Sequence, residues 1–161
     1  MNQTNDYHIK ILWTGNQGQG TKTYRSYERS YSIVIDGKPD IAGSSDPQYR
    51  GDRTKHNPEE MFLASISACH MLWYLHLCAD HGISVLHYID EVRGHLKFNN
   101  EGKGQFNEVV LHPKVTISDS EMESKALYLH QLANQFCFIA NSCNFNIRHK
   151  PTIRFENTEK M

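Results

Sequence analysis

The spacing of hydrophobic and polar positions changes along the chain, and it predicts strands in the first third. Apolar side chains alternate with polar ones from Tyr7 to Trp13, which is typical of a half-buried strand. A second strand is predicted over Tyr27–Ile35 and closed by the turn dipeptide Asp36-Gly37. The glycine-rich segment TGNQGQGT predicts a hairpin turn, because a dinucleotide-binding loop would need a third glycine and a following helix. Residues 38–56 are polar and predict a long loop, a kind of segment that is often functional.

A long helix is predicted next, and it is apolar on every side. Asn57 is a suitable N-cap, and Glu60 three residues later completes a capping box. Nearly every residue from Met61 to Ala79 is apolar, and Gly82 ends the helix. A helix of this kind must be covered all round, which one small sheet cannot do. We therefore expect a second copy of the chain to cover it, in an intimate homodimer.

The same helix has nearly the length of a membrane span. However, the chain has no second apolar segment of this length, and the helix carries four polar residues. These are Ser65, Ser67, His70 and His76. The sequence therefore favours a buried core helix, with no membrane partner.

After this helix the pattern returns to strands, interrupted by one more helix. Four strands are predicted, over Ser84–Asn99, Gly104–Ile117, Phe145–Ile147 and Thr152–Phe155. Gly94 predicts a bulge or bend within the first of them. Ser118 predicts the cap of a second helix, with Glu121 completing its capping box, and the helix continues to Phe136. Because no βαβ unit repeats, the fold class is α+β.

Composition narrows the class of protein further. A chain of 161 residues suits one domain, and a net charge of -1 gives no global basic field for nucleic acid. The N-terminal segment lacks a basic region followed by an apolar one, so we expect a cytoplasmic protein. Four cysteines are too few for a disulfide scaffold, and in a reducing compartment paired cysteines are more often catalytic or redox-active.

Cys69, in the middle of the long helix, has two interpretations. As a free cysteine it could be a small buried hydrophobe. As a nucleophile it would need a stabilised thiolate, and it lies too far from the helix start for the dipole to help. An arginine from elsewhere would be the activating cation, held in place by Glu59 through a bidentate pair. Cys137, at the end of the second helix, is the natural partner for a disulfide, whereas Cys78 and Cys143 are interpreted as bystanders.

Two other uses of these side chains are weaker hypotheses. His76, Cys78 and His81 offer ligand types for a metal, but their spacing matches no recognisable zinc site. A Cys–His acyl-transfer site using His70 or His130 is chemically feasible, but no oxyanion-hole motif can be identified.

Two cysteine motifs resemble those of one known family. The run NPEE, followed eight residues later by CH, resembles the first-cysteine helix of the OsmC/Ohr family, the osmotically inducible and organic hydroperoxide resistance proteins. The run LANQFCFIANSCNF resembles its second-cysteine segment, and SYERSY and GSSDPQYRGD extend the resemblance over nearly the whole chain. The resemblance implies a single OsmC-like domain over residues 1–161. Two long central helices would be wrapped by antiparallel sheets in an intertwined homodimer with active sites at the subunit interface.

The resemblance also implies a function. It implies a thiol peroxidase that reduces organic hydroperoxides, with Cys69 peroxidatic, Cys137 resolving and Glu59 orienting an arginine. One branch of the family points to Arg29 in SYERSY and another to Arg50 in QYRGD, and we rank Arg29 first. The reductant would be an external dithiol, a lipoyl group being one option, and no cofactor or metal is expected.

Two departures from the family pattern and one rival function remain open. His70 stands where better-known branches often have Phe, and Cys143 adds a thiol beside the resolving segment. The rival function is a non-catalytic domain that binds a small hydrophobic ligand. In the peroxidase interpretation, a set of apolar residues near the site would favour organic peroxides over hydrogen peroxide. The set is Met61, Phe62, Trp73, Phe136 and Phe138.

Overall fold

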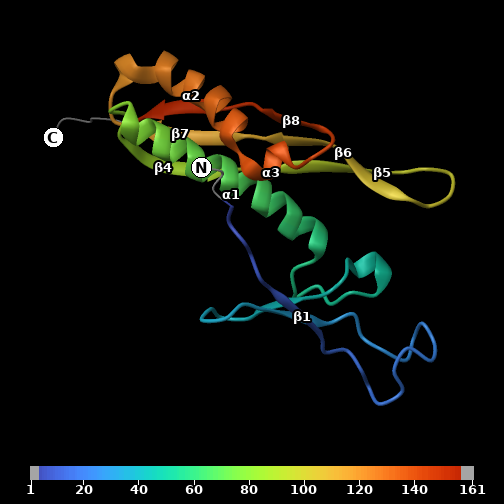
Figure 1. Ribbon diagram of the computed structural model, residues 1–161. Coiled ribbons are helices and arrows are strands. Elements are labelled where there is room, and N and C mark those ends of the chain that lie inside the picture. Colours follow the sequence, from blue (N-terminus) through green and yellow to red (C-terminus); the bar gives the residue numbers. More distant parts are fainter. Residues whose placement is uncertain (1–3, 157–161) are drawn as a thin grey trace. The chain divides into compact units, whose positions relative to one another are not determined.

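The computed structural model describes residues 4–156, and the chain forms two compact units, residues 1–61 and residues 62–161. We call these the N-terminal and the C-terminal unit. The N-terminal unit contains a three-stranded antiparallel sheet in the order β1–β2–β3 (Figure 1). Its elements are β1 Lys10–Trp13, β2 Tyr31–Val34, β3 Ile41–Gly43 and a 3-10 turn at Pro47–Tyr49. The single domain expected over the whole chain stays a prediction.

Both predicted N-terminal strands exist but are shorter than expected. Gly37 has a φ of 71°, and Lys38 N–H donates to the Ile35 carbonyl at 3.1 Å, so the predicted turn after β2 is confirmed. The half-burial predicted for the first strand is wrong, since all residues of β1 are exposed in this chain. A single layer of three strands cannot bury its own faces. The predicted loop contains β3, a strand too short to show a period of two.

The long helix α1, Pro58–Asp80, begins and ends where the sequence predicts. The Asn57 side chain accepts from Glu60 N–H at 2.8 Å, and Glu60 accepts from Asn57 N–H at 3.2 Å, so the capping box is confirmed. After the last turn, Gly82 takes a φ of 71°, which lets Ile83 N–H return to the Cys78 carbonyl at 2.8 Å.

Within this chain α1 is buried on one face only. By length and composition alone it could cross a membrane. Its buried residues are those of a core helix and include a histidine: Ile66, His70, Tyr74, Leu77 and Cys78. Leu72 is 62% exposed, so the all-round burial that we expected is not met by this chain alone. Coverage by a second copy stays a prediction.

Each of the two long strands predicted after α1 is in fact two strands. The bounds are β4 Val85–Asp90, β5 Arg93–Phe98, β6 Gly104–Leu111 and β7 Pro113–Ile117. The chain leaves one sheet and joins another at the breaks, because β4 pairs with β7 whereas β5 pairs with β6. The Asp90 carboxylate accepts from His112 N–H at 2.7 Å and so ties the two breaks together.

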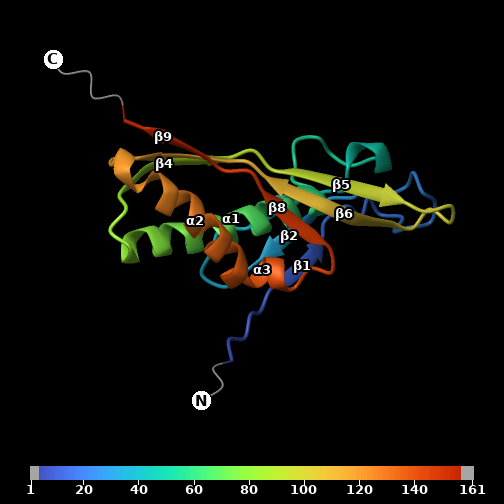
Figure 2. The same ribbon diagram turned by 90° about the horizontal axis from the view of Figure 1, so that it is seen from above.

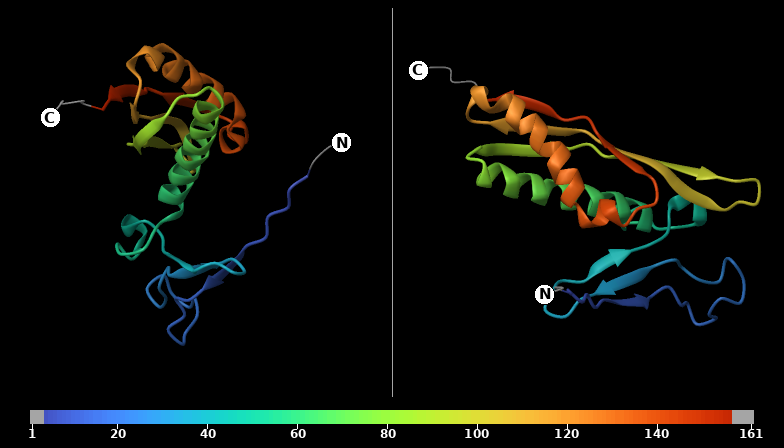
Figure 3. Two further views of the ribbon diagram at one scale, coloured as in Figure 1. Left: turned by 90° about the vertical axis from the view of Figure 1, so that its left-hand side faces the viewer. Right: turned by 45° about the horizontal axis from the view of Figure 1, so that its top comes forward.

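The last two strands join these sheets in parallel. β8 Asn146–His149 pairs with β6, and β9 Thr152–Phe155 pairs with β7, giving the sheet orders β5–β6–β8 and β4–β7–β9. The expectation of antiparallel sheets therefore holds fully only for β1–β2–β3. The β5–β6 hairpin extends beyond the rest of the C-terminal unit (Figure 3).

Two local predictions are corrected in this unit. The register shift lies between His95 and Leu96 rather than at Gly94. Gly94 instead lies close to α1, since a Cβ there would lie 2.7 Å from a Leu63 methyl carbon and that side chain would have to shift. No side chain caps the second helix itself, and the cap predicted at Ser118 is replaced by one at Asp119, which accepts from Glu121 N–H at 2.9 Å. A 3-10 turn at Ser120–Met122 follows this cap.

The helices α1 and α2, Glu123–Phe136, lie on the same face of the sheets (Figure 2). A short helix, α3 at Phe138–Asn141, follows α2. One core cluster joins α1 and α2 to the β4–β7–β9 sheet, and a second joins α1 to the β5–β6–β8 sheet. This packing brings the middle of α1 to the end of α2.

Candidate active site

An apolar cavity of about 460 Å³ lies along one face of α1 in the C-terminal unit. Its α1 residues recur three and four positions apart, the spacing that places side chains on one helix face. Two further residues come from α3. The lining is Ser65, Cys69, Leu72, Trp73, His76, Phe138 and Ile139. Cys69 is partly exposed there, so its sulfur is accessible to a small apolar molecule.

Cys137 is fully buried and lies beside Cys69. It ends α2 and begins α3, where its sulfur accepts from Ala140 N–H at 3.4 Å. Burial, followed by hydrogen bonding and charge from Cys69, raises the pKa of Cys137 to about 11. Cys137 is therefore a protonated thiol at neutral pH. All four cysteines are free thiols.

Aromatic rings form one end of this cavity. Trp73 stacks on Phe136 with ring centroids 5.1 Å apart and meets Phe138 edge-on at 5.6 Å. Phe62, which the sequence suggested for this group, instead packs in the second core cluster against Phe106, with centroids 5.3 Å apart.

The two candidate arginines line one polar cavity of about 280 Å³ in the N-terminal unit. Arg29 donates to the carbonyls of Tyr27 and Tyr24 at 2.6 and 2.7 Å, and its guanidinium lies 4.2 Å from both tyrosine ring centroids. Arg50 is exposed and has a φ of 67°, the one positive φ among the non-glycine residues at positions 4–156. Arg29 is thus in contact with two carbonyls and two rings, whereas Arg50 is exposed. Arg25 and Arg53 are also exposed.

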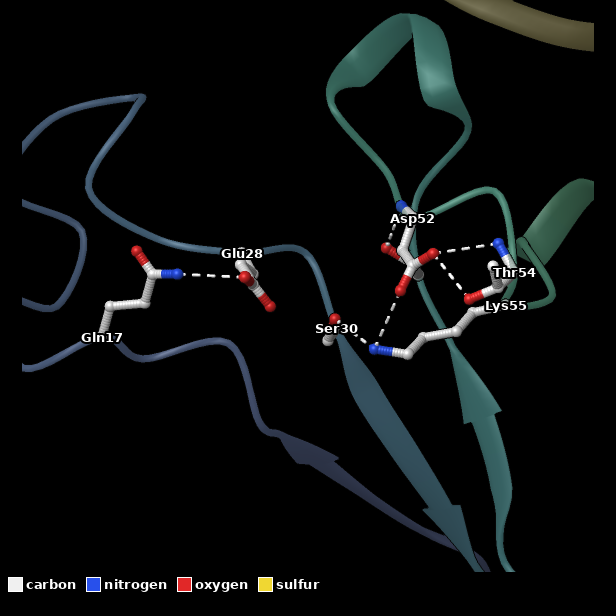
Figure 4. Close-up of polar contacts among 7 residues, drawn as sticks. Gln17, Glu28, Ser30, Asp52, Thr54 and Lys55 are labelled. Atoms are coloured by element: carbon white, nitrogen blue, oxygen red, sulfur yellow. Dashed lines mark hydrogen bonds and ion pairs between the residues drawn. The ribbon is translucent and has the colours of Figure 1, made fainter.

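A hydrogen-bonded network supports the wall of this polar cavity (Figure 4). Asp52 accepts from Thr54 Oγ1 at 2.7 Å and pairs with Lys55 at 3.3 Å, and Lys55 donates to Ser30 at 2.8 Å. The hydrogen bonds from Thr54 are the main cause that lowers the pKa of Asp52. These contacts fix the backbone on both sides of the two arginines.

Glu59 has an incomplete set of partners. One carboxylate oxygen, Oε2, is buried without a hydrogen-bond partner, and no ion pair of Glu59 is found between positions 4 and 156. Burial and then the Glu59 charge raise the pKa of Tyr31. A buried carboxylate oxygen of this kind calls for a cation.

The other candidate residues lie away from Cys69 or serve the core. Cys78 is buried, and the Cys143 thiol donates to the Ile139 carbonyl at 3.2 Å, so neither lines the apolar cavity. Across the part of the chain that the structure describes, no group of three His, Cys, Asp or Glu residues could hold a metal ion.

One contact in the core was not predicted from the sequence. His70 and His130 are 60 positions apart, and their rings meet in the core with Nε2 of His70 3.0 Å from Nδ1 of His130. The two histidines that were considered for acyl transfer therefore bond to each other. In the sequence, each histidine lies among apolar residues of a predicted helix. That pattern does not indicate that the two side chains are in contact.

Comparison with known proteins identifies the family of this fold. The model of the OsmC-like protein family matches residues 51–152. An OsmC-like protein of unknown function from Vibrio cholerae is 28% identical, with a TM-score of 0.83, and the match covers 92% of this chain and 100% of that one. No curated protein matches the chain.

Two other solved structures are more distant. An organic hydroperoxide resistance protein from Elizabethkingia anophelis is 21% identical, with a TM-score of 0.66 over 96% of this chain and 100% of that one. The organic hydroperoxide resistance protein OsmC from Legionella pneumophila is 16% identical, with a TM-score of 0.63 over 94% and 98%. At these identities they share the fold with this chain, and the α+β class expected from the sequence is confirmed.

Proposed function

This chain belongs to the OsmC-like protein family, and we propose that it is a thiol peroxidase that reduces organic hydroperoxides to alcohols. The observation that carries the proposal is the thiol pair: Cys69 lines an apolar cavity, and the protonated Cys137 thiol lies beside it. The hydroperoxide resistance function named for the Elizabethkingia and Legionella proteins supports the same chemistry.

The reaction uses the two thiols in turn. The Cys69 thiolate attacks the distal oxygen of ROOH, the O–O bond breaks, and the alkoxide takes a proton and leaves as ROH. Cys69 is then a sulfenic acid. The Cys137 sulfur attacks it, the S–S bond forms, and water leaves. An external dithiol, such as a lipoyl group, supplies two electrons and restores both thiols.

An arginine is the cation that stabilises the Cys69 thiolate and polarises the peroxide. Glu59 orients it through its otherwise unpaired Oε2, and Arg29 is ranked before Arg50. The contacts of Arg29 with Tyr24 and Tyr27 favour it, because a cation whose side chain is already positioned loses less freedom when it acts.

The working state is a homodimer in a reducing compartment, the cytoplasm. Apolar side chains on β1 and α1 are exposed in the single chain, among them Leu72 at 62%. A second copy of the chain would cover them. Four free thiols suit a compartment that keeps cysteines reduced.

The reduced protein treated with one equivalent of tert-butyl hydroperoxide is expected to form a Cys69–Cys137 disulfide within one chain. Peptide mass spectrometry under non-reducing conditions reads this directly. The same treatment with hydrogen peroxide is expected to be slower, because the cavity is lined mainly by apolar side chains. A Cys69–Cys143 link would reassign the resolving thiol, and equal rates with both peroxides would contradict the organic preference.

If all four thiols stay free while peroxide persists, the catalytic proposal is wrong. The apolar cavity would then favour the second candidate function, binding of a small hydrophobic ligand without chemistry. An acyl-enzyme on Cys69 after treatment with an activated ester would point to acyl transfer instead.

Replacement of Arg29 by Met is expected to lower the rate of Cys69 oxidation by about a hundredfold, the usual effect of losing one preorganised charge. The measurement is the second-order rate of Cys69 sulfenic acid formation, trapped with dimedone. Arg50→Met is the matched variant, since both arginines line the same polar cavity. The reverse result would assign the role to Arg50, and no effect from either would remove the arginine from the mechanism.

A further inference from the structure

His70 and His130 form a buried link between the two helices that carry the thiols. His70 on α1 is 1% exposed and His130 on α2 is 0% exposed. Their facing nitrogens lie 3.0 Å apart, and the rings are nearly parallel, with an interplanar angle of 7°. Between residues 4 and 156, this is the one side-chain hydrogen bond found from α1 to α2.

Both imidazoles are neutral in the folded protein, and their neighbours explain why. Burial first, and then the nearby histidines, lower the pKa of His70 to about 4 and that of His130 to about 2. The His130 ring also stacks on Tyr74 with centroids 3.7 Å apart. Two neutral imidazoles can share one proton between them in a hydrogen bond, one ring donating and the other accepting.

The hydrogen bond between the histidines lies close enough to both thiols to set the position of Cys137 relative to Cys69. His70 directly follows Cys69, so holding its ring fixes the rotation of α1 at Cys69. His130 precedes Cys137 by seven residues, or about two helical turns, and therefore lies on nearly the same face of α2. A disulfide requires Cα atoms about 4.4–6.8 Å apart, so a small slide of one helix along the other prevents it.

We propose that His70 and His130 are a positioning pair whose hydrogen bond holds Cys137 beside Cys69, so that the Cys69 sulfenic acid closes to a disulfide instead of being oxidised further. This inference rests on the proposed peroxidase function and adds a role that the thiols themselves do not explain. Neither histidine lines the cavity, so the pair acts through the helices rather than on the peroxide.

The experiment compares variants that keep or remove the bonding nitrogen. His70→Phe and His130→Phe keep a ring and lose the hydrogen bond. His70→Gln places an amide near the position of Nε2, and His130→Asn places one near Nδ1. His149→Phe is the matched control, because the His149 ring lies tilted beside both rings, with centroids 5.6 and 6.4 Å away, but makes no hydrogen bond to either.

Each protein is treated with tert-butyl hydroperoxide, and sulfenic acid, disulfide and sulfinic acid at Cys69 are followed by mass spectrometry. We expect the Phe variants of His70 and His130 to form sulfenic acid at the wild-type rate but the disulfide about tenfold more slowly, because without the hydrogen bond α2 can shift along α1 and carry Cys137 out of disulfide range of Cys69. Sulfinic acid accumulates in these variants. The Gln and Asn variants and the His149 control stay close to wild type.

Disulfide formation at the wild-type rate in both Phe variants would overturn the proposal, and so would Gln and Asn variants as slow as the Phe variants. If a single Phe variant does not fold, the double variant, which leaves neither imidazole unpaired, is expected to fold and still link slowly. Oxidation by diamide separates this inference from the peroxidase proposal, since it links thiols without peroxide. Slow linking by diamide in the double variant supports the positioning role even where peroxide fails to react, and wild-type linking contradicts it.

Discussion

Replacement of Cys69 by Ser is expected to abolish peroxide turnover, lowering the rate at least about a thousandfold, as removal of a nucleophile usually does. The reason is that a thiolate attacks the peroxide oxygen, whereas a serine hydroxyl is not ionised at neutral pH. The measurement is the consumption of tert-butyl hydroperoxide with a dithiol as reductant. The rate is compared at equal concentrations of folded protein.

Cys143→Ser is the matched control for this experiment. Cys143 is also a partly exposed free thiol, but it lies outside the apolar cavity. Wild-type turnover is expected from it. If Cys69→Ser keeps its activity while Cys143→Ser loses it, the nucleophile is Cys143 and the proposed order of the thiols is wrong.

Acidification from pH 7 to pH 5 is expected to destabilise the folded protein by about 4 kcal/mol, from His70 and His130 together. Their pKa values are about 4 and about 2 when folded, against 6.5 for an unperturbed histidine. Below pH 6.5 the unfolded chain therefore binds protons that the folded protein excludes, and stability falls with pH. Each histidine contributes about 1.4 kcal/mol per pH unit in this window. For His70 the loss ends near pH 4, where the folded form also protonates.

Denaturant unfolding at pH 7, 6 and 5 measures this loss. Asp52 and Glu91 have lowered pKa values and stay ionised at pH 5, so they contribute little to the change. The double variant His70→Phe/His130→Phe is expected to lose most of the pH dependence. A wild-type slope in that variant would show that other groups cause the acid sensitivity.

The residues that form α1 could be predicted because their signals are local. The capping box involves Asn57 and Glu60, three positions apart, and Gly82 ends the helix through its own backbone conformation. The spacing of the two cysteine motifs likewise needed only the order of residues along the chain. These features led to the OsmC-like family and to the proposal that Cys69 and Cys137 react with each other.

Features that depend on distant contacts could not be predicted in the same way. The predicted strand Ser84–Asn99 breaks because its two halves pair with different partners, and a run of alternating residues does not reveal which partner each half will have. The cap predicted at Ser118 lies at Asp119 and starts a 3-10 turn before the second helix, since two neighbouring residues carried equally good capping side chains.

The sequence by itself determined the fold class, the start and end of the central helix and the family motifs that contain the candidate thiols Cys69 and Cys137, because each depends on residues close together in the chain. Only the tertiary structure decided that α1 is buried on one face, that Glu59 keeps an unpaired buried oxygen, and that His70 meets His130. The physical reason is that burial and hydrogen bonding are set by which segments pack together. His70 and His130 are 60 positions apart, and the residues around each of them in the sequence do not indicate that they are in contact.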